Sequence, residues 1–232
     1  VHATKYLASK REDRYGDSGS TVDEGEEGES KKRGNRRIKK DSLIHKNKND
    51  TGDEGADDGA DYRGNLTETE RTFLRAVSQS KYSEAGDQLR QGVDAQVQNY
   101  FKRDAMQIAA RNCDHKMLQL LHSYGGRVNS RGPKGDTLLH LAAYNGGNRA
   151  VKWLCEFGAV PWAVDTNGQH AGHYAARRCN HATVAYLNEE LGLDFSQEDF
   201  EGQTPYMLVP RVASDEDAVL TREYFASKGI YK

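Results

Sequence analysis

A spacing of 33 residues recurs through the last two-thirds of the chain and restricts what this part can fold into. Alanine pairs recur at this spacing and begin at Ala109, Ala142 and Ala175. A glycine column has the same spacing, with one extra residue before its last member, at Gly92, Gly125, Gly158 and Gly192. Agreement of several columns on one period is the signature of a repeat protein, whose units pack only on their neighbours. The period therefore predicts a stack of similar small units.

Each unit contains two apolar segments with helical spacing, separated by a polar turn. In the second unit these segments predict helices over about residues 104–112 and 115–123. The alanines allow neighbouring helices to approach closely, and the glycine after the second helix supplies the left-handed conformation that ends it. One unit alone cannot bury its apolar face, but stacked units bury a continuous core. The expected fold is therefore an all-α solenoid, meaning a stack of helix pairs.

The clearest motif lies in the third unit. Residues 137–142 read TLLHLA, which resembles the ankyrin-repeat signature T-P-L-H-x-A at every position except the proline. Thr204 opens the fifth unit in the same way, and Gly168 and Gly202 match the turn glycine of the family. The chain is thus similar to ankyrin-repeat proteins over residues 66 to about 230. This resemblance implies an ankyrin-repeat solenoid of paired antiparallel helices with β-turn or hairpin tips.

The register divides this region into five units, at about residues 66–99, 100–132, 133–165, 166–199 and 200–232. The first and last units depart from the pattern. Gly86 and Gln88 depart from the pattern within the second helix of the first unit, and Pro210 stands where the fifth unit should have alanine. Terminal repeats are atypical because they cap the stack. We therefore expect two cap-like units, and a fifth unit that is either a true repeat or a divergent cap.

A capping box marks where the repeats begin. Thr67 is followed three residues later by Glu70, and in this pattern each side chain pairs with the free backbone amide of the other residue. We therefore place the boundary near Asn65. It separates a charged low-complexity arm over residues 1–65 from an ankyrin-repeat domain over residues 66–232.

The arm has too few aliphatic residues, and no Phe or Trp, to offset the entropy cost of folding, so we expect it to be disordered or extended. Its charges are grouped, with acidic blocks over residues 21–30 and 50–61 and a basic run over residues 31–40. The basic residues of that run are Lys31, Lys32, Arg33, Arg36, Arg37, Lys39 and Lys40. Such a run is typical of a nuclear-import patch, of contact with RNA phosphates, or of an arm that meets an acidic protein. Composition does not separate the three.

Cysteine and histidine occur together at two equivalent places, Cys113 with His115 and Cys179 with His181. These pairs are two repeats apart, and helices pack about 8–10 Å apart, so about 20 Å separates the pairs. Zinc ligands must all lie about 2.0–2.3 Å from one ion. We therefore predict no metal site and no cofactor.

Other histidines have structural roles in the resemblance. His140 and His173 occupy the histidine position of the signature, where the family ties neighbouring turns by hydrogen bonds, and His170 replaces the usual threonine. A nucleophile and a base would have to converge across repeats on a pocket, and no motif indicates this. We predict no catalytic residue, no enzymatic activity and no small-molecule substrate.

The ankyrin resemblance implies a partner-binding face made of the turn tips and the inner, first helices of the units. The predicted tip residues are Tyr100, Phe101, Lys134, Asn167 and Phe200. The predicted inner-helix residues are Arg111, Asn112, Tyr144, Asn145, Arg177, Arg178 and Arg211. Aromatic residues and arginine are favoured in interface cores, and four arginines in one column favour a partner with an acidic surface.

Two functions fit these features. The first is a protein–protein interaction module, acting as an accessory or scaffold subunit of a larger intracellular complex. The alternative is a subunit associated with a ribonucleoprotein, which contacts RNA through residues 31–40 and the arginine column.

Three cysteines do not fit a secreted disulfide framework. The sequence contains no run of 18 apolar residues, so it predicts no transmembrane helix. We therefore expect an intracellular protein. The chain begins at Val1, as expected of a fragment or of a protein whose presequence has been removed. A removed presequence would indicate a mitochondrion or plastid, and otherwise we expect the nucleus or cytoplasm.

Overall fold

The computed structural model describes residues 66–211 and 216–231, and the predicted arm over residues 1–65, with its acidic blocks and basic run, lies outside them. Within the described ranges the secondary structure consists of helices and isolated bridges, without a strand. The bridges close the turn tips, pairing for example Arg131 with Thr137 and Val164 with His170. The prediction of an all-α solenoid with hairpin-like tips is confirmed.

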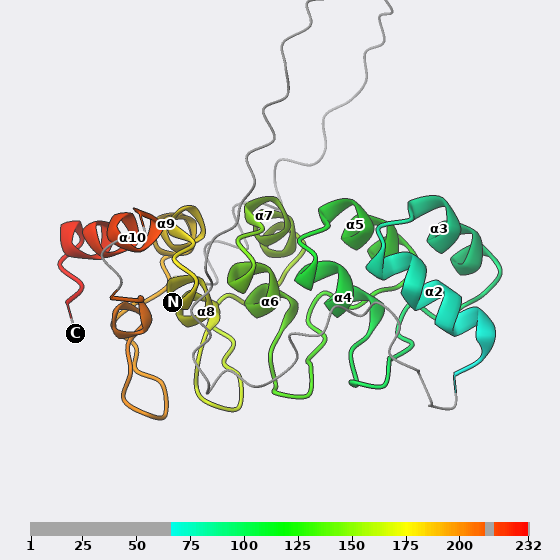
Figure 1. Cartoon of the computed structure of the whole chain (residues 1–232), viewed down its shortest axis with the longest axis horizontal. Coiled ribbons are helices and arrows are strands. Elements are labelled where there is room, and N and C mark those ends of the chain that lie inside the picture. Colours follow the sequence, from blue (N-terminus) through cyan, green and yellow to red (C-terminus); the bar gives the residue numbers. More distant parts are fainter. Residues whose placement is uncertain (1–65, 212–215, 232) are drawn as a thin grey trace, which may run out of the picture. The chain divides into compact units, whose positions relative to one another are not determined.

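The first four units each contribute an inner and an outer helix (Figure 1). The inner helices are α2 (Glu68–Ser78), α4 (Ala105–Arg111), α6 (Leu138–Tyr144) and α8 (Ala171–Arg177). The outer helices are α3 (Tyr82–Arg90), α5 (His115–Ser123), α7 (Asn148–Glu156) and α9 (His181–Glu189). Each inner helix packs on the inner helix of the next unit, and the outer helices form a second row. The helices predicted for the second unit are α4 and α5.

Every inner helix of these four units begins at a capping box. In α2 the Thr67 amide donates to Glu70 Oε2 at 2.7 Å, and the Glu70 amide donates to Thr67 Oγ1 at 3.3 Å, which confirms the predicted start. The other boxes pair Asp104 with Gln107, Thr137 with His140, and His170 with His173. Local sequence thus sets where each inner helix starts, because the box satisfies amides that the helix leaves unpaired.

The core follows the repeat columns. The alanines that recur at 33 residues are fully buried, which lets adjacent inner helices lie against each other. The leucine column of the outer helices is also fully buried, at Leu121, Leu154 and Leu187. In the first unit this column holds Gln88, whose amide donates to Thr72 Oγ1 at 2.8 Å, and the adjacent Leu89 is buried instead.

The fifth unit diverges from the repeat. Its first helix is a single 3₁₀ turn, η2 (Pro205–Leu208), where the pattern predicts an α-helix, and its second is the longer α10 (Glu216–Ser227). Met207 occupies the position that holds histidine in the third and fourth units. The buried Thr204 hydroxyl consequently lacks the imidazole acceptor and has no hydrogen-bond partner among the described residues. The unit is therefore a divergent cap that covers α8 and α9.

Changing Met207 to histidine should stabilise the protein by about 0.5–1 kcal/mol, since it restores an acceptor at the first helical turn of the last unit. Met207 is 48% exposed, so the larger polar ring meets no packed core. The measurement is urea unfolding at neutral pH, where the substituted histidine is largely neutral. Met207→Leu is the control and should leave the free energy of unfolding unchanged. Equal stability of both variants would contradict this explanation of the Thr204 hydroxyl.

Candidate partner-binding face

Two buried histidines fix the turn tips to the preceding inner helices. His140 Nδ1 accepts a hydrogen bond from the Thr137 amide at 3.1 Å, so its proton lies on Nε2, which donates to the Gln169 carbonyl at 2.8 Å. His173 Nε2 donates in the same way to the Gln203 carbonyl at 3.1 Å. Burial lowers the pKa of both imidazoles, which keeps them neutral in this role. The hydrogen bonds between turns that the resemblance implied are therefore present.

The tips of the third, fourth and fifth units are joined in series. The Thr166 amide and hydroxyl each donate to the Lys134 carbonyl at 3.0 Å, and the Phe200 amide donates to the Asn167 carbonyl at 3.0 Å. The Phe200 ring lies over Gly168, where an added Cβ would come within 2.6 Å of the ring. Phe200 is nevertheless 78% exposed. The tip of the fifth unit therefore presents an exposed aromatic ring on a backbone that is fixed to the neighbouring tip.

The aromatic pair at the tip of the second unit is also displayed to solvent. Tyr100 is 67% exposed and Phe101 is 37% exposed, and the two rings meet edge to face with centroids 5.5 Å apart. This pair contacts the fold through its own turn, in which the Asn99 amide donates to the Arg103 carbonyl at 2.8 Å. The predicted tip residues thus form separate aromatic positions at the second and fifth units.

Four residues at the ends of α6 and α8 form a continuous group that we call the Tyr–Arg tract, namely Tyr144, Tyr174, Arg177 and Arg178. The Arg178 guanidinium lies over the Tyr144 ring at 5.0 Å. The rings of Tyr144 and Tyr174 are 6.1 Å apart, and the Arg177 guanidinium lies 6.0 Å from the Tyr174 ring. The structure thus brings together three of the predicted inner-helix residues and adds Tyr174.

Tyr174 was missed because it occupies the variable position of the signature, which holds buried Ile108 and Leu141 in the preceding units. Its hydroxyl donates to Asp165 Oδ2 at 2.8 Å, and burial together with this carboxylate raises the pKa of the tyrosine. Asp165 is held in turn by the amides of Asn167 and Gln169. The turn over residues 165–169 therefore fixes the orientation of the Tyr174 ring.

Gln169 is a second residue that the sequence did not indicate. Its side-chain carbonyl accepts from Arg177 at 3.0 Å, and its amide nitrogen donates to Asp199 Oδ2 at 2.6 Å. Its backbone carbonyl is the acceptor for His140. Gln169 is 5% exposed and links His140 of the third unit to Arg177 and Asp199 of the fourth unit behind the tract. Its position in the turn gives no local sequence signal of this role.

The remaining predicted residues of the inner column lie at helix ends. Asn112 and Asn145 are exposed, and each donates to a nearby backbone carbonyl, that of Ser78 and Leu141 respectively. Arg111 is half-buried and has its own contacts, whereas Arg211 is exposed. The four arginines therefore share a column but not an environment.

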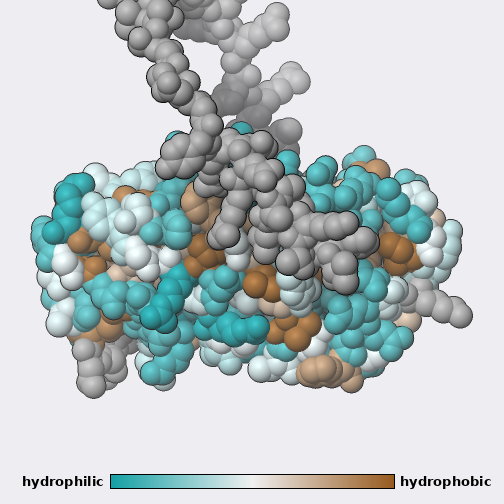
Figure 2. Space-filling model, turned by 180° about the vertical axis from the view of Figure 1, so that it is seen from behind, coloured by the Kyte–Doolittle hydropathy of each residue, from teal (hydrophilic) through white to brown (hydrophobic). Residues whose placement is uncertain are grey.

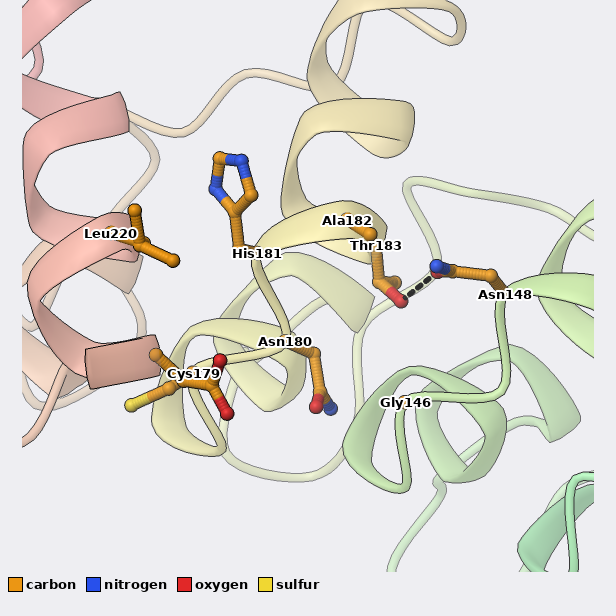
Figure 3. A pocket seen from close by; sticks show the side chains of 9 residues that line it. Gly146, Asn148, Cys179, Asn180, His181, Ala182, Thr183 and Leu220 are labelled. Atoms are coloured by element: carbon orange, nitrogen blue, oxygen red, sulfur yellow. Dashed lines mark hydrogen bonds between the residues drawn. The ribbon is translucent and has the colours of Figure 1, made fainter. Parts of the chain in front are cut away.

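The cysteine and histidine pairs lie elsewhere. Cys113 and Cys179 take left-handed backbone conformations, with φ of 55° and 57°, between the inner and outer helices. Cys179 and His181 line a cavity of about 290 Å³ beside α10, in which the two side chains point in different directions (Figure 3). Nowhere in the described part of the chain do three His, Cys, Asp or Glu residues group as metal ligands would.

The molecular surface is mixed in character. Figure 2 shows hydrophobic areas separated by hydrophilic ones on the side opposite to the view of Figure 1, where grey atoms do not cover it. Among the residues described, no helix has both the length and the apolar composition needed to cross a bilayer.

Comparison with known proteins identifies the repeats. Residues 73–165 match the family model described as ankyrin repeats, in three copies. The Notch-regulated ankyrin repeat-containing protein B of Danio rerio is 37% identical over 73 residues, which are 32% of this chain and 66% of that protein.

Two longer proteins match over more of the chain. A Caenorhabditis elegans homolog of transient receptor potential cation channel subfamily A member 1 is 30% identical over 167 residues, or 70% of this chain. Diacylglycerol kinase iota of Rattus norvegicus is 29% identical over 153 residues, or 60% of this chain. The matched regions are only 13% and 14% of these two proteins, so this chain spans a small part of their length. With its helix pairs, capping boxes, histidine ties and matching sequence, the chain carries ankyrin repeats.

Proposed function

We propose that the repeats form a non-catalytic docking module whose inner helices and turn tips hold a partner protein with an acidic surface. Ankyrin repeats are protein–protein interaction modules, and this coarser function applies to the chain, which carries them. The Tyr–Arg tract carries the finer proposal. Arginine and tyrosine are the residue types most enriched in binding hot spots, and here they form one group at the ends of α6 and α8.

The proposed role is that of an accessory or scaffold subunit in a larger intracellular assembly. Hydrogen bonds between successive tips support a rigid docking surface, because a preformed surface loses little conformational entropy when it binds. Phe200 provides a further exposed aromatic contact at the tip of the fifth unit. Tyr100 and Phe101 provide another at the tip of the second unit.

The Arg177→Glu, Arg178→Glu double variant should lose its protein partners in affinity purification followed by quantitative mass spectrometry. Two reversed charges in the tract would repel an acidic partner, and a desolvated interface charge pair is worth about 2–5 kcal/mol. The matched control is Lys116→Glu with Arg149→Glu, which makes the same charge change at exposed positions of α5 and α7. Partners that are retained by the tract variant would refute this choice of face. Circular dichroism must first show that both variants are folded.

RNA binding through the basic run over residues 31–40 and the arginine column is the alternative. The salt dependence of binding separates the two, because each phosphate contact releases counterions and steepens the plot of log K against log salt. A steep linear slope that disappears when residues 31–40 are neutralised would favour RNA. A shallow slope, with unchanged binding in that variant, would favour the docking module.

A further inference from the structure

The Tyr–Arg tract presents two guanidinium groups whose contacts are neutral. Arg178 lies over the Tyr144 ring, and Arg177 contacts the Tyr174 ring and the Gln169 carbonyl. Within residues 66–211 and 216–231, neither arginine forms an ion pair with a carboxylate. The tract therefore keeps two positive charges on the surface of the inner helices.

Stacking orients these charges. A guanidinium that lies over an aromatic ring exposes the N–H groups along its edge, and these match the two oxygens of a carboxylate. Lysine shares the charge but lacks the planar fork. Tyr174 and Gln169, which contact Arg177, are themselves fixed by hydrogen bonds. The Tyr174 hydroxyl donates to Asp165, and the Gln169 side-chain amide donates to Asp199. The tract is thus oriented for carboxylates that approach from outside.

The spacing of the two tyrosine rings that support the arginines matches that of an extended ligand. The rings of Tyr144 and Tyr174, each beside one arginine, are 6.1 Å apart. In an extended chain, side chains at alternate positions lie on one face and are about 6.6 Å apart. Adjacent residues of such a chain point to opposite faces, so two neighbouring carboxylates cannot both face the tract.

Within the proposed docking function, we propose that the occupant of the tract is an extended peptide segment of a partner with acidic residues at alternate positions. In this (Asp/Glu)-x-(Asp/Glu) pattern one carboxylate pairs with Arg178 and the next with Arg177. Gln169 is a positioning residue, since it holds the Arg177 side chain without touching the ligand. Charge complementarity favours this occupant, and the spacing restricts its sequence.

The test is a fluorescence-anisotropy titration of the full chain with two labelled ten-residue peptides of identical composition. One alternates glutamate with glycine over its whole length, and the other has the order EEGGEEGGEG, in which no two glutamates are at alternate positions. The alternating peptide should bind about tenfold more tightly, because only it places carboxylates on both guanidinium groups. An alternating glutamine and glycine peptide of the same length should not bind measurably.

Single variants distinguish a specific arginine site from a nonspecific charged surface. Arg178→Lys keeps the charge, but it should weaken binding of the alternating peptide about fivefold and remove the preference over the reordered peptide. Tyr144→Leu should also reduce the preference for the alternating peptide, because the Arg178 guanidinium loses its contact with the aromatic ring. The matched control, Arg149→Lys on α7, should leave both affinities unchanged. Thermal unfolding of each variant shows whether a loss of binding comes from a loss of fold.

Three results would overturn the inference. Equal affinities for the two glutamate peptides would show a nonspecific charge effect. Tighter binding of an alternating phosphoserine peptide would indicate a phosphate ligand, and tighter binding of oligouridine with a steep salt slope would indicate RNA. If the peptides fail but the Arg177→Glu, Arg178→Glu variant still loses its partners, this inference fails and the docking function stands.

Discussion

Replacing Phe195 with alanine should destabilise the protein by about 3–5 kcal/mol, the usual cost of emptying a fully buried aromatic site. Phe195 is 1% exposed and joins two units. Its ring lies 5.9 Å from the His170 ring of the fourth unit and 5.5 Å from the Phe225 ring of α10. Because repeat proteins are held together by contacts between neighbours, we expect the fifth unit to detach first and unfolding to become biphasic.

Urea unfolding followed by circular dichroism measures the total effect, and hydrogen exchange shows which units open. Phe200→Ala is the control, because that ring is 78% exposed and its loss should cost less than about 0.5 kcal/mol. A single cooperative transition with wild-type stability in Phe195→Ala would show that the fifth unit does not depend on this ring.

The site of Phe195 explains an unusual sequence in the fourth unit. There the signature leucine is Gly172, whereas the third unit has buried Leu139 at the equivalent position. A Cβ on Gly172 would lie 2.7 Å from His170 Cε1 and 2.9 Å from Phe195 Cε1. The two rings thus fill the volume that leucine occupies elsewhere, and each departure from the signature compensates for another.

Acid should destabilise the repeats, with loss beginning below about pH 6.5, the pKa of an unperturbed histidine. Burial lowers the pKa of His140, His170 and His173 in the folded protein, that of His170 to about 3. The unfolded state then binds more protons, so stability is full above the unfolded pKa and is lost as the pH falls towards the folded values. His170 alone accounts for about 2 kcal/mol between pH 7 and pH 5.

The hydrogen bonds of the three histidines explain why protonation destabilises the folded protein. His170 Nδ1 accepts the Gly172 amide at 3.0 Å, and His140 and His173 accept amides at the same atom. A second proton would place a donor against each amide, at a helix start where the dipole also disfavours positive charge.

Urea unfolding measured from pH 5 to pH 7.5 gives the slope of stability against pH. His170→Gln keeps a side-chain acceptor but cannot be protonated, so near pH 5 its slope should fall by about one proton, or about 1.4 kcal/mol per pH unit, and by less towards pH 7.5. An unchanged slope would mean that His170 does not titrate in this transition.

The sequence by itself determined the period, the pairs of helices and the starts of the inner helices. These depend on apolar spacing and on capping between residues three apart, such as Thr67 and Glu70. Such interactions are local, so they can be recognised in the sequence alone. It also placed His140 and His173 correctly, because the signature fixes their position within each unit. The single turn at Pro205–Leu208 was not predicted, although it ends at Val209, which is extended as expected of a residue that precedes proline.

The tertiary structure alone decided which side chains meet across units. Tyr144 and Tyr174 are 30 residues apart, and Phe195 and Phe225 are equally far apart in sequence, yet their rings are neighbours. Such contacts depend on how far one unit is rotated and translated against the next, which no local pattern records. For this reason the arginine column could be counted from the sequence, but the supports that orient Arg177 and Arg178 became visible only when the units were stacked.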